Sequence, residues 1–252
     1  MNSICMASFN GEKYIKSQID SILSQIDEND ELIISDDGST DQTVNIICSY
    51  QDDRIKFVQN IARHGCIGNF ENALKKASGN FIFLADQDDV WLPDKYRKIC
   101  GLLQQYDLVV SDSVVVDSNL QMIEPSFFKY YNSGAGIMKN VIRSTYYGSC
   151  MAFRNSILHK ALPFPLTNEI GHDLWLGLVA EITGRVLFFN EPLILYRRHE
   201  SAFCKISGEE NKKGRCLSQK IAGRIVMIRE LLRFKIGIVL RGKPYSSKNV
   251  HC

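Results

Sequence analysis

The sequence lacks the marks of several common protein classes. Its 8 cysteines include no Cys-x-x-Cys pair, which disfavours a structural zinc site. The start of the chain has no basic segment ahead of a long apolar core, and no stretch approaches about 18 uninterrupted apolar residues. The Gly-x-Gly-x-x-Gly fingerprint after the first strand and the Gly-Lys-Ser/Thr phosphate loop are also absent. We therefore expect a cytoplasmic chain with reduced thiols, no membrane-spanning helix, and no NAD or P-loop site.

The composition suits one large folded domain with an appendage of opposite charge. The 252 residues are 45% hydrophobic and 23% charged, which is enough apolar surface for a single core. Residues 1–200 carry 18 basic and 25 acidic residues, whereas residues 201–252 carry 12 basic and 3 acidic residues. We expect a domain over residues 1–204 and a separate basic tail over residues 205–252.

Short β-rich runs alternate with segments of helical length and period. The expected strands are Ile4–Phe9, Glu31–Ser35, Ile55–Val58, Phe81–Ala85 and Leu108–Val116. The expected helices are Glu12–Ile26, Asp41–Tyr50, Gly68–Ala77 and Asp94–Tyr106. The alternation predicts an α/β fold with a mostly parallel sheet and helices on both faces. The segment 123–141 mixes aromatic residues with Gly, Ser and Asn, and we expect a long surface loop there.

Three carboxylates directly follow the apolar run FIFLA. Asp86, Asp88 and Asp89 repel one another unless a cation or hydrogen bonds compensate. Mg²⁺ and Mn²⁺ use one or two protein carboxylates and fill their other positions with water and phosphate oxygens. In an open parallel sheet, ligands bind beyond the carboxyl ends of the strands. The position favours a metal and a diphosphate ligand; the alternative is a solvated acidic turn that caps the next helix.

Other polar residues stand at comparable positions. Asp36 and Asp37 end another strand and could accept from a pyrimidine N3–H or from ribose hydroxyls, unless they form an ordinary capping turn. Asp173 begins an apolar helical run, a position suited to a general base, with an N-cap as the alternative. Arg197 and His199 follow a strand-like segment and could supply a cation or an imidazole to a diphosphate, or form a basic surface turn.

Six segments together resemble the family 2 glycosyltransferases of the GT-A fold, over about residues 1–200. In chain order they are SFNGEKYI, IISDDGSTD, FIFLADQDDVWLPDK, GSCMAFR, GHDLWL and YRRHE. The resemblance is strongest to bacterial members that assemble O-antigen, capsule or other surface polysaccharide. It implies a nucleotide-sugar donor, a divalent metal (Mn²⁺ or Mg²⁺) and inversion at the anomeric carbon. The Gln-x-x-Arg-Trp motif of processive synthases is missing, which favours addition of a single sugar.

The resemblance also implies roles in donor binding. It puts Ala7 and Phe9 near the donor base, with Phe9 able to stack on it. Asp37, with Asp36 beside it, would hold the base or the ribose. Apart from the resemblance, the place of Arg197 after a strand-like segment would let it bind the donor by supplying positive charge near the diphosphate.

Metal and catalytic roles follow from the same resemblance. Asp88 would be the direct metal ligand, and Asp86 would contact the ribose or a metal-bound water. His199 matches a position that completes the metal site in some relatives. Asp173 matches the catalytic base, although His172 stands before it where many members have Glu. As the base, Asp173 would deprotonate an acceptor hydroxyl, which attacks the anomeric carbon opposite the diphosphate.

Two rival functions remain open from the sequence. One is a nucleotide-sugar-binding or saccharide-binding protein of this fold without catalysis, and the intact Asp86, Asp88 and Asp173 argue against it. The other is a metal-dependent phosphohydrolase, which needs an aspartyl nucleophile after the first strand, where this chain has Ser8-Phe9-Asn10. No motif reports the sugar, the acceptor or the linkage, because a few hydroxyl contacts in loops decide them.

The tail contains an apolar stripe at helical spacing. The stripe consists of Leu217, Ile221, Ile225, Ile228, Leu232, Ile236 and Val239, and basic residues stand beside or opposite it. The pattern favours an interfacial helix on an anionic membrane, at the inner face, where a polyprenyl-diphosphate-linked acceptor would lie. Packing of the stripe on the domain or on a second subunit in a homodimer is the alternative. Nucleic-acid binding is disfavoured, because aromatic residues are not interleaved with the basic ones.

Overall fold

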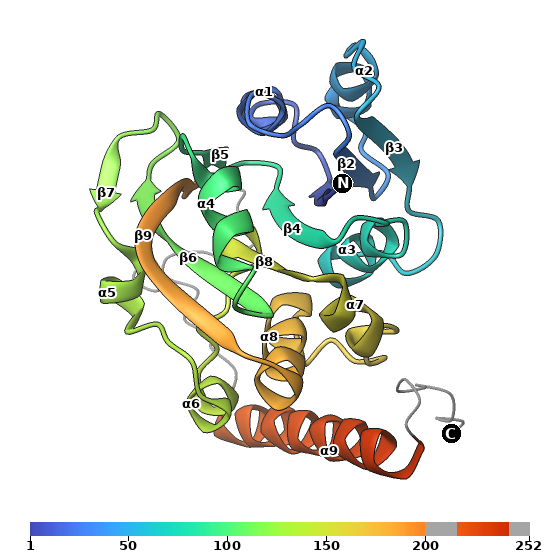
Figure 1. The fold of residues 1–252 in the computed structure, drawn as a ribbon, viewed down its shortest axis with the longest axis vertical. Coiled ribbons are helices and arrows are strands. Elements are labelled where there is room, and N and C mark those ends of the chain that lie inside the picture. The colour runs from blue at the N-terminus through green and yellow to red at the C-terminus, as the bar shows by residue number, and fades with distance from the viewer. Residues whose placement is uncertain (200–215, 242–252) are drawn as a thin grey trace.

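Nine strands form one sheet in the computed structural model, which describes residues 1–199 and 216–241 (Figure 1). The strands are β1 Ser3–Ser8, β2 Glu31–Asp36, β3 Ile55–Gln59, β4 Phe81–Asp86, β5 Val90–Trp91, β6 Leu108–Val116, β7 Met122–Glu124, β8 Met151–Arg154 and β9 Val186–Arg197. The helices are α1 Ile15–Leu23, α2 Thr43–Cys48, α3 Cys66–Leu74, α4 Lys95–Leu102, α5 Phe127–Tyr131, α6 Ile137–Ile142, the 3-10 turn η1 Gly148–Cys150, α7 Asn155–Ala161, α8 His172–Thr183 and α9 Leu217–Arg241.

The sheet has the order β3-β2-β1-β4-β8-β6-β9-β5, and β7 pairs with β6. β1 is parallel to β2 and β4, and β2 is parallel to β3. β8 lies between β4 and β6 and runs antiparallel to both, so β6 points the same way as β4. The five expected strands therefore all run in one direction, as predicted. The sheet is mixed because β5, β7 and β8, which were not expected, pair antiparallel.

Helices cover both faces of the sheet, as predicted. In β1 the side chains of Ile4 and Met6 point to one face and that of Cys5 to the other, and all three are fully buried. The first face packs against α1, α2 and α4, and the second against α3, α7 and α8. A parallel strand covered on both sides needs a continuous apolar run, which is why these strands are recognisable from the sequence.

The expectation of one long surface loop over 123–141 is wrong. This stretch contains part of β7 and the short helices α5 and α6. Phe127 and Phe128 of α5 are buried in the core, and Asp112 in β6 holds the start of the helix by accepting from the N–H of Phe128 and the hydroxyl of Ser126. Two of the four aromatic residues that suggested a binding loop are therefore core residues, whereas Tyr130 is 48% exposed.

Helix α9 packs against the rest of the chain through one side. Met227, Leu231 and Phe234 are buried in the same core as α8, and the Phe234 ring meets Trp175 edge-on with 5.6 Å between centroids. Figure 1 shows α9 along the lower edge of the molecule, beside α6 and α8. The expected domain boundary between residues 204 and 205 lies outside the described residues.

The apolar stripe of α9 is not the side that packs on the domain. Its members with described side chains are 47% to 61% exposed, and they are Ile221, Ile225, Ile228, Leu232 and Ile236. At about 100° of rotation per residue, the stripe lies roughly opposite the buried residues of the helix. Among residues 1–199 and 216–241, no helix has the length and apolar character needed to cross a bilayer.

Candidate active site

The predicted donor and metal residues stand on neighbouring strand ends. Ala7 in β1 lies opposite Asp86 in β4, and Ser8 lies opposite Asp36 in β2. β1 is flanked by β2 on one side and β4 on the other, so the chain changes direction across the sheet at this point. Open α/β sheets bind ligands at such a switch point, beyond the carboxyl ends of the strands.

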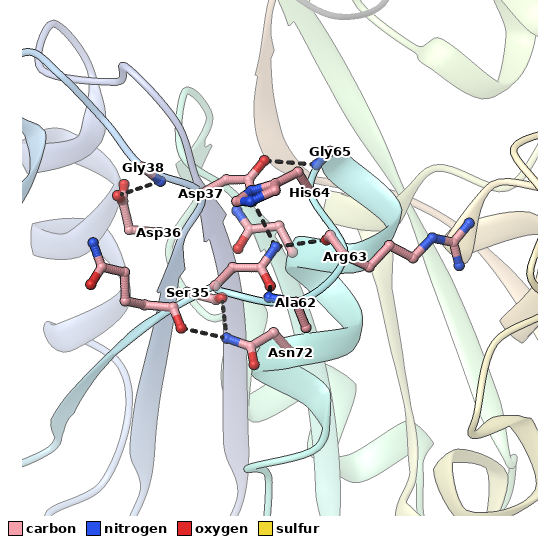
Figure 2. Close-up of polar contacts among 12 residues, drawn as sticks. Ser35, Asp36, Asp37, Gly38, Ala62, Arg63, His64, Gly65 and Asn72 are labelled. Atoms are coloured by element: carbon pink, nitrogen blue, oxygen red, sulfur yellow. Dashed lines mark hydrogen bonds and ion pairs between the residues drawn. The ribbon is translucent and has the colours of Figure 1, made fainter.

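Asp36 is fully buried and stabilises the turn after β2. Its Oδ1 accepts from the backbone N–H groups of Gly38 and Ser39 at 3.0 and 2.8 Å. Its Oδ2 accepts from the hydroxyls of Ser8 and Ser39 at 3.0 and 2.5 Å. Gly38 has a φ of 88°, which glycine adopts without steric cost. Asp36 therefore shapes the turn from inside, and the side chain of Asp37 points away from it (Figure 2).

Asp37 is bound by a loop that the sequence analysis did not single out. Its carboxylate accepts from Asn60 Nδ2 and from the backbone N–H of Gly65, both at 2.7 Å, and it lies 2.9 Å from His64 Nδ1 (Figure 2). The Asp37 side chain is 12% exposed, whereas that of His64 is 69% exposed. The loop between β3 and α3 thus forms one wall beside Asp37. The one residue that could have indicated this loop from the sequence is Gly65, because its φ of 92° favours glycine.

Gln87 fixes the end of β1 to the loop after β4. Its Oε1 accepts from the Phe9 N–H and its Nε2 donates to the Phe9 carbonyl, both at 2.9 Å. A Cβ atom on Gly11 would lie 2.2 Å from Gln87 Oε1, so a larger residue here would displace the Gln87 amide from Phe9. The Phe9 side chain is 53% exposed and free to stack on a ligand.

The end of β9 returns to the acidic loop. His199 Nε2 lies 2.8 Å from Asp88 Oδ2, and the His199 ring is 4.8 Å from that of Tyr14. Arg197 is buried and donates from Nε to the carbonyl of Asp88 and from Nη1 to that of Ser118. Its guanidinium lies 4.4 Å from the centre of the Tyr14 ring. Arg197 thus supports the loop that presents Asp88.

A buried cation accompanies the buried carboxylates. Lys95, in the first turn of α4, is 1% exposed and donates to the carbonyl of Ser149 at 2.9 Å. Burial lowers the pKa of Lys95 to about 8. Burial, followed by the negative charges of Asp88 and Asp173, raises the pKa of Asp86 to about 8. The sequence analysis missed Lys95, which stands two residues after the only proline of this loop.

Asp89 is enclosed behind the loop. It is fully buried, its Oδ1 accepts from the backbone N–H of Arg197 at 2.9 Å, and its Oδ2 has no hydrogen-bond partner among residues 1–199 and 216–241. Burial, followed by the charges of Asp88 and Asp86, raises the pKa of Asp89 well above its usual value. The carboxylates of this loop therefore lack enough nearby positive charge to offset their repulsion.

Asp173 lies in the first turn of α8 and acts electrostatically on Asp86. The N-cap of α8 is Gly171, so the N-cap alternative for Asp173 is wrong. Asp173 is half-buried, and its Oδ1 accepts from the adjacent Leu174 N–H at 2.7 Å. His172 is buried against Phe70, with ring centroids 4.0 Å apart, and burial lowers its pKa.

The acidic loop offers ligands that suit a hard divalent cation. Asp88 and His199 already lie within hydrogen-bond distance of each other, and Asp86 stands two residues before Asp88. Within the described part of the chain, no group of three or more His, Cys, Asp or Glu side chains is gathered closely enough to hold a metal alone. Mg²⁺ and Mn²⁺ accept such incomplete protein sites, because phosphate oxygens and water fill the remaining positions. Carboxylate oxygen with one imidazole nitrogen fits that chemistry.

Comparison with known proteins agrees with this geometry. Over 192 residues the chain is 29% identical to the Escherichia coli UDP-Glc:alpha-D-GlcNAc-diphosphoundecaprenol beta-1,3-glucosyltransferase WfgD, covering 71% of this chain and 70% of that protein. The fold matches Staphylococcus aureus TarS in complex with UDP-GlcNAc, with a TM-score of 0.65 and 19% identity over 96% of this chain and 76% of that one. It also matches the Pyrobaculum calidifontis mannosyltransferase PcManGT in complex with GDP-Man and Mn²⁺, with a TM-score of 0.58 and 18% identity over 80% of this chain and 58% of that one.

A family model covers most of the sheet and the whole acidic loop. The model described as glycosyl transferase family 2 matches residues 3–162, which is more than half of the 252 residues. The matched range includes β1 to β8 and the residues Asp37, Asp86 and Asp88, and it ends before Asp173. The chain belongs to glycosyl transferase family 2 and has the GT-A fold of its structural neighbours.

Proposed function

We propose that this protein transfers one sugar from a UDP- or dTDP-sugar to a hydroxyl of a lipid-linked saccharide, with inversion and with a divalent metal. The observation that carries the proposal is the place of Asp86 and Asp88 at the end of β4, next to the end of β1, with His199 Nε2 2.8 Å from Asp88 Oδ2. Burial, followed by the negative charges of Asp88 and Asp173, raises the pKa of Asp86. Asp86 ends β4 and Asp88 follows it, and Asp173 lies in the first turn of α8, where its Oδ1 accepts from the N–H of Leu174.

The donor contacts follow from the strand ends. Asp37 can accept the N3–H that both uracil and thymine carry, and Phe9 can stack on the ring from the end of β1. In this proposal Asp36 contributes by shaping the turn that presents Asp37, because its own oxygens already accept four hydrogen bonds. Ala7 lies beside the donor without a side chain that would block it.

Asp88, Asp86 and His199 would hold the metal ion. A bound Mn²⁺ or Mg²⁺ would offset the negative charge that develops on the departing diphosphate. Arg197 holds the Asp88 loop in place by donating from Nε to the Asp88 carbonyl, and it adds positive charge next to the loop. Burial and the charges of Asp88 and Asp173 raise the pKa of Asp86, and a bound cation would offset the repulsion among these carboxylates.

Asp173 would act as the general base. Its half-buried carboxylate, on a rigid helix, takes the proton of the acceptor hydroxyl as that oxygen forms its bond to the anomeric carbon. The bond between the anomeric carbon and the diphosphate breaks on the opposite face, and the nucleoside diphosphate leaves with the bonding electron pair. A single displacement of this kind inverts the anomeric configuration.

The proposed acceptor is a polyprenyl-diphosphate-linked saccharide of a bacterial surface polysaccharide such as O-antigen or capsule. The name of the similar glucosyltransferase WfgD specifies a diphosphoundecaprenol-linked acceptor, which supports this choice. A lipid-linked acceptor requires the enzyme to work at the inner face of the cytoplasmic membrane, as a peripheral protein.

A thermal-shift screen of UDP-, dTDP- and GDP-sugars with Mn²⁺ tests the donor assignment, because a ligand that binds only the native state raises the melting temperature. We expect UDP- or dTDP-sugars to raise it and GDP-sugars to leave it unchanged. Incubation of the stabilising donor with lipid-linked saccharide acceptors then tests the reaction. Donor binding without transfer would support the inactive binding protein, and rapid donor hydrolysis without an acceptor would support the phosphohydrolase.

A further inference from the structure

Helices α6 and α9 together carry a concentration of exposed apolar side chains. On α6, Met138 is 71% and Ile142 is 68% exposed. On α9 the stripe is about half exposed throughout the described side chains. We use the name α6–α9 face for these exposed residues together: Met138, Ile142, Ile221, Ile225, Ile228, Leu232 and Ile236.

The two helices form one surface. α6 packs beside α9, and Arg224 of α9 donates a hydrogen bond to the carbonyl of Ile142 at the end of α6 (Figure 1). On α9, Arg224 stands between the buried side and the stripe, next to Ile221 and Ile228. Ile142 therefore borders the stripe, and Met138, one turn earlier on α6, lies on the same side of that helix as Ile142.

Positive charge surrounds this face. Between Leu217 and Arg241 the sequence has six basic residues and a single acidic one, Glu230. Glu230 is 5% exposed and already pairs with Arg229 and Arg233, so it adds no free negative charge to the surface. The helix α6 adds Lys139 and is followed by the exposed Arg143.

The basic residues of α9 lie along both sides of the stripe. At about 100° per residue, Arg224 and Lys235 fall along the edge that faces α6, and Arg229 and Arg233, which also pair with Glu230, fall along the other edge. An apolar band with cations along both edges matches an anionic bilayer, in which acyl chains meet the band and phosphate groups meet the cations. Two copies of this face brought together would instead oppose positive charge to positive charge.

We propose that the α6–α9 face is the membrane-docking surface of this protein and that its partner is a bilayer rich in anionic phospholipid. The proposal rests on the proposed function for its biological purpose, namely access to a lipid-linked acceptor. It adds that the catalytic domain itself contributes to docking through α6, so the tail is not the sole anchor. Because α9 is packed into the core, the domain would be held on the bilayer in one orientation.

Point variants are better tests than removal of the tail, because Met227, Leu231 and Phe234 belong to the core. The two test variants are Ile225→Asp with Leu232→Asp on α9, and Met138→Asp with Ile142→Asp on α6. The matched control is Met122→Asp with Ile123→Asp on β7, whose side chains are 66% and 45% exposed. Circular dichroism melting establishes that each variant is folded.

The measurement is flotation of the full chain with vesicles of phosphatidylglycerol and phosphatidylethanolamine, compared with vesicles of phosphatidylcholine alone. We expect the wild type and the β7 control to float with the anionic vesicles and to be released as salt rises. Each of the α6 and α9 variants should lose on the order of tenfold or more in the bound fraction. A folded α6 variant that binds as well as the wild type would overturn the proposal, and so would a wild type that does not bind.

Sedimentation velocity without lipid tests whether the α6–α9 face binds a second copy of this chain instead of a membrane. We expect a monomer for the wild type and for all variants. A wild-type dimer that the α6 and α9 variants dissociate would overturn membrane docking in favour of a subunit interface.

The donor thermal shift, measured on the same proteins, should be unchanged in every variant. A protein that floats but binds no donor would leave the docking surface intact and contradict the proposed function alone.

Discussion

The Nε2 atom of His199 lies 2.8 Å from Oδ2 of Asp88, although the two residues are 111 positions apart in the sequence. β9 brings His199 back to the acidic loop, and the ring of Tyr14 packs against it. The pair combines the two ligand types, carboxylate oxygen and imidazole nitrogen, that a divalent transition metal such as Mn²⁺ accepts.

We predict that this pair contributes to metal binding. Mn²⁺ should raise the melting temperature of the wild type in the presence of UDP, and EDTA should abolish both this shift and sugar transfer. Asp88→Asn should weaken Mn²⁺ binding by at least tenfold in isothermal titration. The exposed Asp94, which pairs with Arg97 on α4, provides the control substitution Asp94→Asn. Transfer that continues at the same rate in EDTA contradicts the metal assignment.

The position of Asp173 leads to a second prediction. Asp173→Asn keeps the size of the side chain and removes its ability to accept a proton. Donor binding, read from the thermal shift, should remain within a factor of about two. The rate of transfer should fall by roughly three or more orders of magnitude, because a positioned general base and the geometry around it are both lost. Near-normal turnover would remove Asp173 from the role of base.

Gln87 gives a third prediction, because its amide binds both backbone polar groups of Phe9. Gln87→Met keeps the length and loses both hydrogen bonds, each with a net value of about 1 kcal/mol. The end of β1 should then loosen, and the donor dissociation constant should rise by roughly threefold to tenfold, as measured by calorimetry. The exposed Gln105 provides the control Gln105→Met, for which no change in donor affinity is expected.

The local pattern of the sequence was sufficient for the parallel half of the fold. β1, β2 and β4 are mainly apolar runs ended by polar residues, and strands covered on both faces give that signal without help from distant contacts. The positions of Asp37, Asp86 and Asp88 at strand ends follow from the same pattern. The family resemblance then supplied the roles that no single motif could assign.

Tertiary packing decides the features that the sequence did not reveal. Asp36 and Asp37 are adjacent carboxylates in the sequence, and only their contacts show that Asp36 is enclosed in the turn with Ser8, whereas Asp37 faces the loop between β3 and α3 at Gly65. The burial of Phe127 and Phe128 could not be predicted locally, because the rings that they contact, Tyr147, Phe188 and Tyr196, come from later in the chain. The apolar stripe of α9 is the more regular pattern, yet the less regular set with Met227 and Phe234 packs on the core.

His172 provides a prediction for pH dependence. Burial lowers the pKa of its imidazole in the folded state, although the neighbouring Asp173 partly opposes the shift. In the unfolded chain the pKa is about 6.5, so below that pH the unfolded state binds the proton more readily. The free energy of unfolding should therefore fall as pH decreases below about 6.5, by up to about 1.4 kcal/mol per pH unit from this group.

The substitution His172→Asn isolates this contribution because asparagine does not titrate. The stability advantage of the wild type over the variant, from urea unfolding, should be smaller at pH 5.5 than at pH 7.5. The surface residue His159 in the last turn of α7 supplies a matched control, His159→Asn, which should show no comparable pH dependence. Equal differences at both pH values for His172→Asn would mean that the imidazole is not held neutral by burial.

The contact between Phe234 and Trp175 tests whether α9 is an integral part of the catalytic domain. Phe234 is 1% exposed, and its removal leaves a cavity against the ring of Trp175. Phe234→Ala should lower the free energy of unfolding by about 3 to 5 kcal/mol, as for other buried aromatic residues. Leu232→Ala, two residues away and 55% exposed, should change it by no more than about 0.5 kcal/mol. If α9 were instead an independent tail, both substitutions would leave the unfolding of the domain unchanged, so the difference between them measures how firmly the docking face is held to the active site.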